Sequence, residues 1–116
     1  MRLEEDQIQK HLVLWMKYKH PDILFTSAPG CSKSAREGSQ KKKMGYLPGW
    51  PDLFFAAARK GWYGLFIELK TENGIVSKKQ KEILKQLNNE GYKAVVAYSA
   101  KDAEDIIDQY LTRVRK

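Results

Sequence analysis

The sequence predicts an α/β fold, a mixed central β-sheet flanked by helices, with its elements in the order αββ(β)αβα. Segments whose apolar residues recur every three or four positions alternate with short runs of apolar and β-branched residues, the patterns of amphipathic helices and buried strands. A length of 116 residues is the usual size of one domain with one modest core. No repeat or long linker divides the chain, so residues 1–116 are predicted to form a single domain.

The first helix is expected from Leu3 to about Lys19, because its apolar residues recur at helical spacing: Ile8, Leu12, Trp15 and Met16. The pair His20–Pro21 ends this helix, since the residue before a proline avoids the α region. Residues 23–27 then form a short strand pattern. The following stretch, Ala28 to Tyr46, is rich in Gly, Ser and Lys, so we expect a loop with a helical turn before Met44.

A β-hairpin is expected in the middle of the chain. Residues 52–58 and Leu65–Lys70 have strand character, and the segment "RKGWYG" makes a tight connection between them. The two strands of this hairpin would pair in antiparallel fashion.

The last third of the chain predicts a helix, a strand and another helix. Ser77 is a candidate N-cap with Gln80 three residues later, and Gly91 suits the position just after the helix. The apolar stripe between them consists of Ile83, Leu84 and Leu87. Residues 94–98 form the strand, and a last helix from Asp102 to about Arg113 turns four residues inward: Ile106, Ile107, Tyr110 and Leu111.

Composition limits the class of protein. The chain is 42% hydrophobic and 30% charged, which is typical of a folded globular protein. No apolar run approaches the length of a membrane span, and the polar start "MRLEEDQIQK" does not resemble a signal peptide. A single cysteine, Cys31, cannot form an internal disulfide, which favours a reducing, intracellular setting. With only two histidines, a Cys/His zinc finger is also excluded.

The net charge is +7, and the basic residues occur in clusters, notably around residues 33–43, 78–85 and 113–116. This excess suits a polyanionic partner, either nucleic acid or an anionic membrane surface. Solvated surface charge that aids solubility is an equally good interpretation of charge alone. A membrane-binding protein would also need an amphipathic helix with lysines opposite a broad apolar face, and the sequence does not show one.

Three charged residues stand among apolar strand residues. Glu68 and Lys70 are two apart and therefore share one face of their strand, and Asp52 begins the strand predicted to pair with theirs. Two carboxylates and one ammonium would then meet at one edge of the sheet, and hard oxygen ligands of this kind suit Mg²⁺. The alternatives are a turn role for Asp52 and an ordinary solvated edge strand for Glu68 and Lys70.

Two acidic residues compete for a role at the start of the first helix. At 100° per residue, the apolar stripe is centred about 35° from Glu5 and about 65° from Glu4, so Glu5 points inward more directly. Alternatively, acidic residues at a helix N-terminus simply interact well with the helix dipole. Gln9 is equally well interpreted as a boundary residue.

Taken in order, these residues resemble a known nuclease family. The residues concerned are Gly49-x-Pro51-Asp52, Glu68-x-Lys70, the helical Gln80, and Glu5 and Gln9 in the opening helix. From Glu5 to about Tyr98 the chain resembles the VRR-NUC branch of the PD-(D/E)xK nucleases. The resemblance implies a restriction-endonuclease-like core of the stand-alone bacterial or phage type, acting in the host cytoplasm. The segment "APGCSKS" departs from the "PN"-containing loop of many members, which bears on substrate contacts.

The resemblance also implies roles for individual residues. Asp52, Glu68 and the main-chain carbonyl of Leu69 would bind Mg²⁺ or Mn²⁺, with Glu5 as a possible further ligand. Lys70 would orient or help deprotonate the attacking water. Gln80 would hold Lys70 or the water in place, although its capping-box position is a strong alternative.

The activity implied is that of a divalent-metal-dependent DNA endonuclease, selective for branched DNA such as a Holliday junction. A homodimer would present two sites to symmetry-related strands. We expect five basic residues of the Lys-rich loop to contact the DNA backbone: Lys33, Arg36, Lys41, Lys42 and Lys43. Trp50 and Trp62 are candidates for base stacking or for plain packing. The alternative function is a non-catalytic nucleic-acid-binding module, which would predict a broken metal-binding set.

Overall fold

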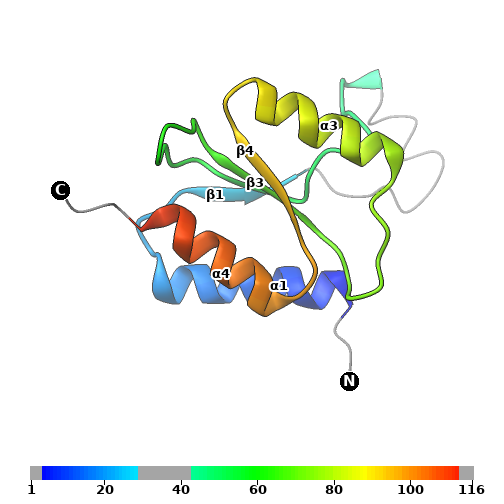
Figure 1. Ribbon diagram of the computed structural model, residues 1–116. Coiled ribbons are helices and arrows are strands. Elements are labelled where there is room, and N and C mark those ends of the chain that lie inside the picture. The colour runs from blue at the N-terminus through cyan, green and yellow to red at the C-terminus, as the bar shows by residue number, and fades with distance from the viewer. Residues whose placement is uncertain (1–3, 29–42, 113–116) are drawn as a thin grey trace.

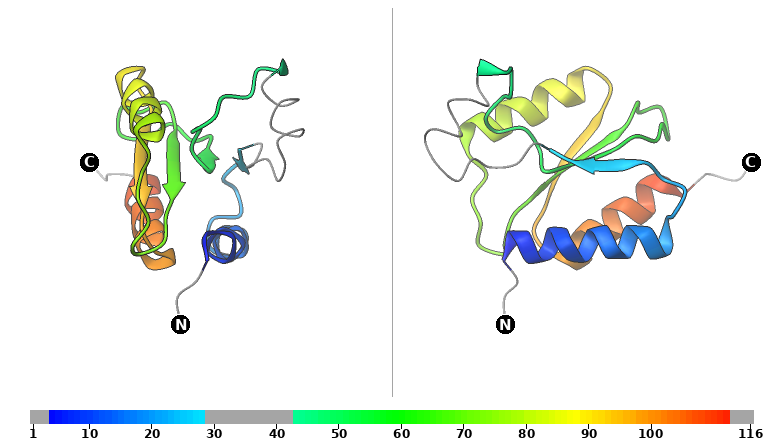
Figure 2. Two further views of the ribbon diagram at one scale, coloured as in Figure 1. Left: turned by 90° about the vertical axis from the view of Figure 1, so that its right-hand side faces the viewer. Right: turned by 180° about the vertical axis from the view of Figure 1, so that it is seen from behind.

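The computed structural model describes residues 4–28 and 43–112, and it places a four-stranded mixed sheet between two helical layers (Figures 1 and 2). The α/β fold with a mixed sheet flanked by helices is confirmed. The strands lie side by side in chain order: β1 (Phe25–Ser27), β2 (Leu53–Phe55), β3 (Leu65–Leu69) and β4 (Lys93–Ala97).

Strand direction changes across the sheet. β1 pairs antiparallel with β2, and β2 pairs antiparallel with β3, with Leu53 opposite Ile67. β3 and β4 are parallel, because helix α3 (Lys78–Asn89) carries the chain back over the sheet between them. In Figure 1, α3 covers one face, while α1 (Glu5–Lys19) and α4 (Ala100–Leu111) cover the other.

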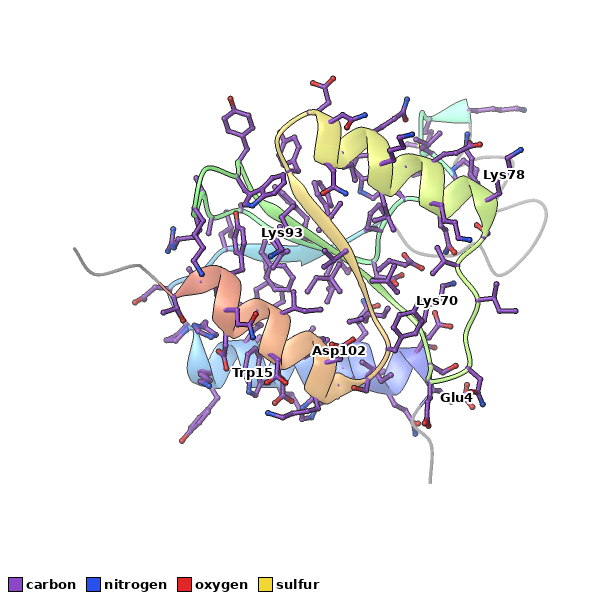
Figure 3. All side chains as sticks on the ribbon, viewed as in Figure 1. Glu4, Trp15, Lys70, Lys78, Lys93 and Asp102 are labelled. Atoms are coloured by element: carbon purple, nitrogen blue, oxygen red, sulfur yellow. The ribbon has the colours of Figure 1, made fainter. Side chains whose placement is uncertain are left out.

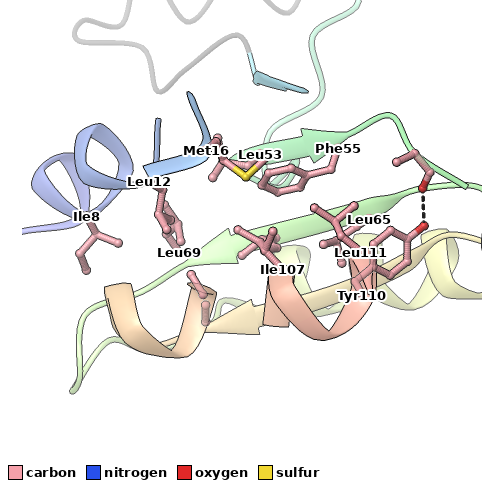
Figure 4. Close-up of a cluster of buried hydrophobic side chains, with 14 residues drawn as sticks. Ile8, Leu12, Met16, Leu53, Phe55, Leu65, Leu69, Ile107, Tyr110 and Leu111 are labelled. Carbon is pink, nitrogen blue, oxygen red and sulfur yellow. Dashed lines mark hydrogen bonds between the residues drawn. The ribbon is translucent and has the colours of Figure 1, made fainter. Parts of the chain in front are cut away.

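The larger part of the core lies between the sheet and the pair α1 and α4 (Figure 4). Alternate strand residues point to this side, where they meet one stripe from each helix. The fully buried side chains include Leu12, Met16, Leu53, Phe55, Leu65, Ile67, Leu69, Ile107 and Tyr110. The hydroxyl of Tyr110 donates to the main-chain oxygen of Ala57 at 2.6 Å, and this bond anchors α4 to the chain that follows β2 (Figure 4).

A smaller apolar cluster lies between α3 and the opposite face of the sheet. Phe66 and Ala94 of the strands meet Ile83, Leu84 and Leu87 of the helix. The predicted stripe of this helix is therefore confirmed.

Both ends of α3 follow the sequence prediction. Ser77 is the N-cap, and its hydroxyl accepts from the main-chain nitrogen of Gln80 at 3.1 Å. Gly91 follows the C-cap with φ +101°, a backbone conformation that favours glycine.

The hairpin between β2 and β3 turns at two residues of positive φ, Lys60 and Gly61, between the bridged pair Arg59 and Trp62. Positive φ at both central residues is typical of a type I′ turn, whose twist matches that of the flanking strands. The predicted tight connection is confirmed.

Several predicted limits were wrong. β1 begins at Phe25 instead of residue 23. β2 ends at Phe55 instead of residue 58, because the main-chain nitrogen of Ala57 turns back to the oxygen of Phe55 at 3.0 Å, although that of Ala56 still donates to Leu24 at 2.9 Å. β4 runs one residue earlier than expected. α4 begins at Ala100 because Ser99 is its N-cap and accepts from the main-chain nitrogen of Asp102 at 3.0 Å. Leu3 and Arg113 lie outside the described residues.

Candidate active site

Asp52 and Glu68 are cross-strand neighbours. The register that sets Leu53 opposite Ile67 continues by one residue and brings Asp52 opposite Glu68. Oδ2 of Asp52 accepts a hydrogen bond from the main-chain nitrogen of Leu69 at 2.7 Å. The predicted approach of the two carboxylates at one edge of the sheet is therefore present in the structure.

The segment before Asp52 is fixed against α3. Gly49 has φ +87°, and a Cβ at this position would lie 3.0 Å from Cγ of Lys79 and 3.2 Å from Cδ1 of Ile83. Pro51 is fully buried, and proline restricts the backbone further. A glycine is needed here because the chain passes so close to the helix, and Asp52 is thereby held at a set position relative to α3.

Glu68 is a buried carboxylate with two polar neighbours on one of its oxygens. The side chain is 3% exposed. Oε2 accepts from Nε2 of Gln80 at 2.8 Å and lies 3.5 Å from Nζ of Lys70. Oε1 is buried and has no hydrogen-bond partner within the part of the chain that the structure describes. A buried oxygen in this condition is costly unless a ligand, or a proton shared with Asp52, satisfies it.

Gln80 completes the predicted capping box and also reaches the candidate site, although with a different partner from the one expected. Its Oε1 accepts from the main-chain nitrogen of Ser77 at 2.9 Å, which completes the capping box, while its Nε2 holds Glu68. Its partner in the site is thus the carboxylate of Glu68, in place of the expected Lys70.

The two carboxyl groups have raised pKa values. The pKa of Glu68 is raised to about 7, chiefly by burial and then by the negative charge of Asp52, while the charge of Lys70 works against both. Burial also raises the pKa of Asp52, although the hydrogen bond from Leu69 opposes this effect. Burial and mutual repulsion therefore favour one shared proton near neutral pH, unless further positive charge is brought to the pair.

The donor set fits a divalent cation. Two adjacent carboxylates, one with an unsatisfied buried oxygen, are hard ligands of the kind that Mg²⁺ and Mn²⁺ take, and a cation would let both remain ionised. Among the described residues, no group of three or more His, Cys, Asp or Glu side chains is arranged to hold a metal ion. Protein carboxylates would therefore supply only part of the coordination, as is usual for Mg²⁺.

Lys70 follows the last residue of β3 (Figure 3). Its main-chain nitrogen still donates to the oxygen of Ala97 at 2.9 Å, so the backbone continues the sheet for one residue. The side chain is 12% exposed. The ammonium group is therefore largely withdrawn from water, beside the carboxylate of Glu68.

The first helix contributes a residue that the sequence did not indicate. Asp6 is exposed, and its charge is a minor cause among those that raise the pKa of Asp52, so the start of α1 has a small electrostatic effect on the site. Glu5, which was expected to point inward, is instead exposed in the same turn, and Gln9 is partly buried. Asp6 lies about 135° from the centre of the apolar stripe, and helical periodicity therefore gave no signal for it.

The remaining sequence candidates are distributed as follows. Lys33, Arg36, Lys41 and Lys42 lie outside the described residues, and Lys43 is exposed. Trp50 is 39% exposed and meets Phe66 edge-on, while Trp62 packs against the larger core.

Within residues 4–28 and 43–112, none of the helices combines the length and apolar character required to cross a membrane.

Comparisons with known proteins found a matching family and a similar solved structure. The family profile described as "VRR-NUC domain" matches residues 1–101. A solved structure titled "VRR_NUC domain protein" is 31% identical in sequence and superimposes with a TM-score of 0.81, covering 94% of this chain and 88% of the other. No curated protein matches the chain.

Proposed function

Because this chain belongs to the VRR-NUC domain family of nucleases, we propose that it is a divalent-metal-dependent DNA endonuclease that hydrolyses phosphodiester bonds. Family membership implies a nucleic acid substrate and hydrolysis of a phosphodiester. The metal dependence and the choice of DNA are the further content of the proposal.

The observation that carries the proposal is the pair Asp52 and Glu68, with the buried and unsatisfied Oε1 of Glu68. These two carboxylates, with the main-chain carbonyl of Leu69, would hold Mg²⁺ or Mn²⁺, and Glu5 is a candidate for a further ligand. When bound, the metal would lower the pKa of a bound water and stabilise negative charge on the phosphate.

Two side chains would act beside this pair. Lys70, already withdrawn from water next to Glu68, would orient the attacking water, help its deprotonation through the positive charge of the ammonium group and offset charge at the phosphate. Gln80 would keep Glu68 in one orientation through its 2.8 Å hydrogen bond.

We further propose that the DNA is branched, that two copies of the chain act together as a dimer, and that the setting is the host cytoplasm. The net charge of +7 suits the dense phosphates of a junction. A two-fold dimer would place two sites on the symmetry-related strands of a four-way junction. The single cysteine suits a reducing compartment.

The test is cleavage of end-labelled four-way junction, flap, duplex and single-stranded DNA with Mg²⁺, with Mn²⁺ and with chelator. We expect cutting that needs metal, is lost in Asp52→Ala and is kept in Asp105→Ala, a control that removes an exposed carboxylate of α4. Tight DNA binding by the intact protein, without cutting under any of these conditions, would instead support the non-catalytic binding module.

A further inference from the structure

A groove of about 370 Å³ lies next to the site, on the face of the sheet that carries α3. α3 packs over β4, and the view in Figure 2 (left) shows that it does not extend over β1. The groove occupies that uncovered part of the face. Its lining among the described residues consists of Thr26, Ser27, Ala28, Trp50, Pro51, Phe54, Phe66, Leu87 and Tyr92.

Four of the nine lining residues are aromatic, and their rings meet in two orientations. Phe54 and Phe66 stack on each other with centroids 4.5 Å apart and 27° between their planes. Trp50 meets Phe66 edge-on at 5.4 Å and 87°, and Tyr92 meets it at 5.5 Å and 73°. These contacts leave Phe66 buried, at 5% exposed, and Phe54 and Tyr92 partly buried, while Trp50 is 39% exposed and offers most of the ring surface that a flat aromatic ligand could contact.

The groove is continuous with the candidate active site. Trp50 and Pro51 directly precede Asp52 in the chain. Phe66 is two residues before Glu68 on the same face of β3, about 7 Å along the strand. A ligand bound in the groove would therefore lie within about one nucleotide of the two carboxylates.

The chemistry of the lining selects a neutral, planar group. None of the nine lining residues carries a charge at neutral pH. Charge is found beside the lining instead, where Asp52 and Glu68 lie and where Nζ of Lys70 is 3.5 Å from Oε2 of Glu68. This division suits a nucleotide, whose neutral and flat base would contact the lining while its anionic phosphate faces Lys70 and the proposed metal, which offset the charge of the two carboxylates.

We propose that the groove binds an unpaired nucleobase of the DNA strand that is cut, from a nucleotide next to the scissile phosphate. The inference rests on the proposed nuclease function and gives it a substrate requirement. A base inside an intact duplex is already stacked, so only an unpaired or unstacked nucleotide offers its face to these rings. Stacking of this kind is tolerant of sequence, because every base has an aromatic face.

The test measures whether Trp50 and one base are energetically coupled. A fluorescein-labelled flap DNA is prepared with a normal nucleotide or an abasic residue at each unpaired position next to the branch, and its Kd is measured in chelator. For the intact protein, we expect the abasic residue at one position to weaken binding roughly 5- to 150-fold. In Trp50→Leu this penalty should disappear, because the ring that recognises the base is gone.

Two further variants keep the test interpretable. Trp50→Phe keeps an aromatic face and should restore most of the penalty. Tyr18→Leu removes an aromatic ring on α1 that is 89% exposed, outside the groove, and should leave the penalty unchanged.

The inference is overturned if the abasic penalty is the same in the intact protein and in Trp50→Leu, or if no position shows one. It is also overturned if Trp50→Leu dissociates a dimer in sedimentation without changing the penalty, since the groove would then be a contact between copies. Because binding is measured without metal, these outcomes are distinct from failure of the nuclease proposal, which would appear as an absence of cutting.

Discussion

Nε2 of Gln80 donates to Oε2 of Glu68 across 2.8 Å, while Oε1 of the same amide accepts from the main-chain nitrogen of Ser77 across 2.9 Å. One side chain thus closes the first turn of α3 and orients a carboxylate of the candidate site. The start of this helix and the buried end of β3 are held together by these contacts. A change at Gln80 should therefore affect both stability and activity.

Gln80→Ala and Ser77→Ala separate these two effects. Each removes part of the capping box and should lower the free energy of unfolding by about 1 kcal/mol, measured by urea unfolding. Only Gln80→Ala also releases Glu68, so only this variant should slow single-turnover DNA cleavage, by about tenfold or more. Equal slowing in Ser77→Ala would mean that Gln80 acts through helix stability alone.

Stability should depend on pH through Glu68. Its pKa is raised to about 7 in the folded protein, so the folded state holds this proton more tightly than the unfolded chain does. The resulting stabilisation is complete below the ordinary pKa of glutamate and is lost as the pH rises through about 7. In chelator, we expect the free energy of unfolding to fall by on the order of 2–3 kcal/mol between about pH 5 and 8.

The variant Glu68→Gln should flatten this pH dependence, because it removes the titrating group. Glu82→Gln, which changes an exposed glutamate of α3, should keep the full dependence. An unchanged slope in Glu68→Gln would show that another group titrates over this range.

Divalent metal should stabilise the folded protein and displace the shared proton. At a free Mg²⁺ concentration a hundred times its Kd, we expect about 2.7 kcal/mol of added stability, with a higher Tm at neutral pH. Calorimetry in buffers of different ionisation enthalpy should show proton release on binding, since the pKa of Glu68 is about 7. Asp52→Asn should lose both effects. A Tm that rises equally in Asp52→Asn would place the metal elsewhere.

Lys70→Ala should slow cleavage by about 10²- to 10⁴-fold while the protein remains folded. The loss of the nearby ammonium should also raise the pKa of Glu68 further, because its charge normally lowers that pKa. The matched control is Lys101→Ala, which removes an exposed lysine paired with Asp105 on α4. Normal turnover in Lys70→Ala would remove Lys70 from the site.

The acidic residues at the start of α1 should differ in their effects. Glu5→Gln should slow cleavage more than Glu4→Gln, because Glu5 lies closer to the apolar stripe.

Asp6→Asn should lower the pKa of Asp52, since the charge of Asp6 is one of the causes that raise that pKa. The acidic limb of the pH–rate profile should then move to lower pH. α1 would be excluded from the chemistry if the acidic limb of the pH–rate profile does not move in Asp6→Asn and if Glu4→Gln and Glu5→Gln cleave DNA at equal rates.

The sequence alone predicted the order of the elements, the ends of α3 and the turn between β2 and β3. These features depend on neighbouring residues: a serine three places before a glutamine, a glycine after a helix, and apolar residues at a fixed spacing. It also predicted that Asp52 and Glu68 would meet, because strand pairing follows once a hairpin is recognised. Strand limits were less accurate, because they depend on where the ladder of the partner strand ends.

Only the tertiary structure decided the partner of Gln80, the burial of Glu68, the influence of Asp6 and the aromatic groove. Each depends on how α3 and α1 pack against the sheet, and the residues involved are far apart in the chain. A pattern of neighbouring residues records which side of a helix or strand is apolar. It does not record the distance between two elements, and that distance sets which carboxylate loses water, which amide reaches it and how far its pKa moves.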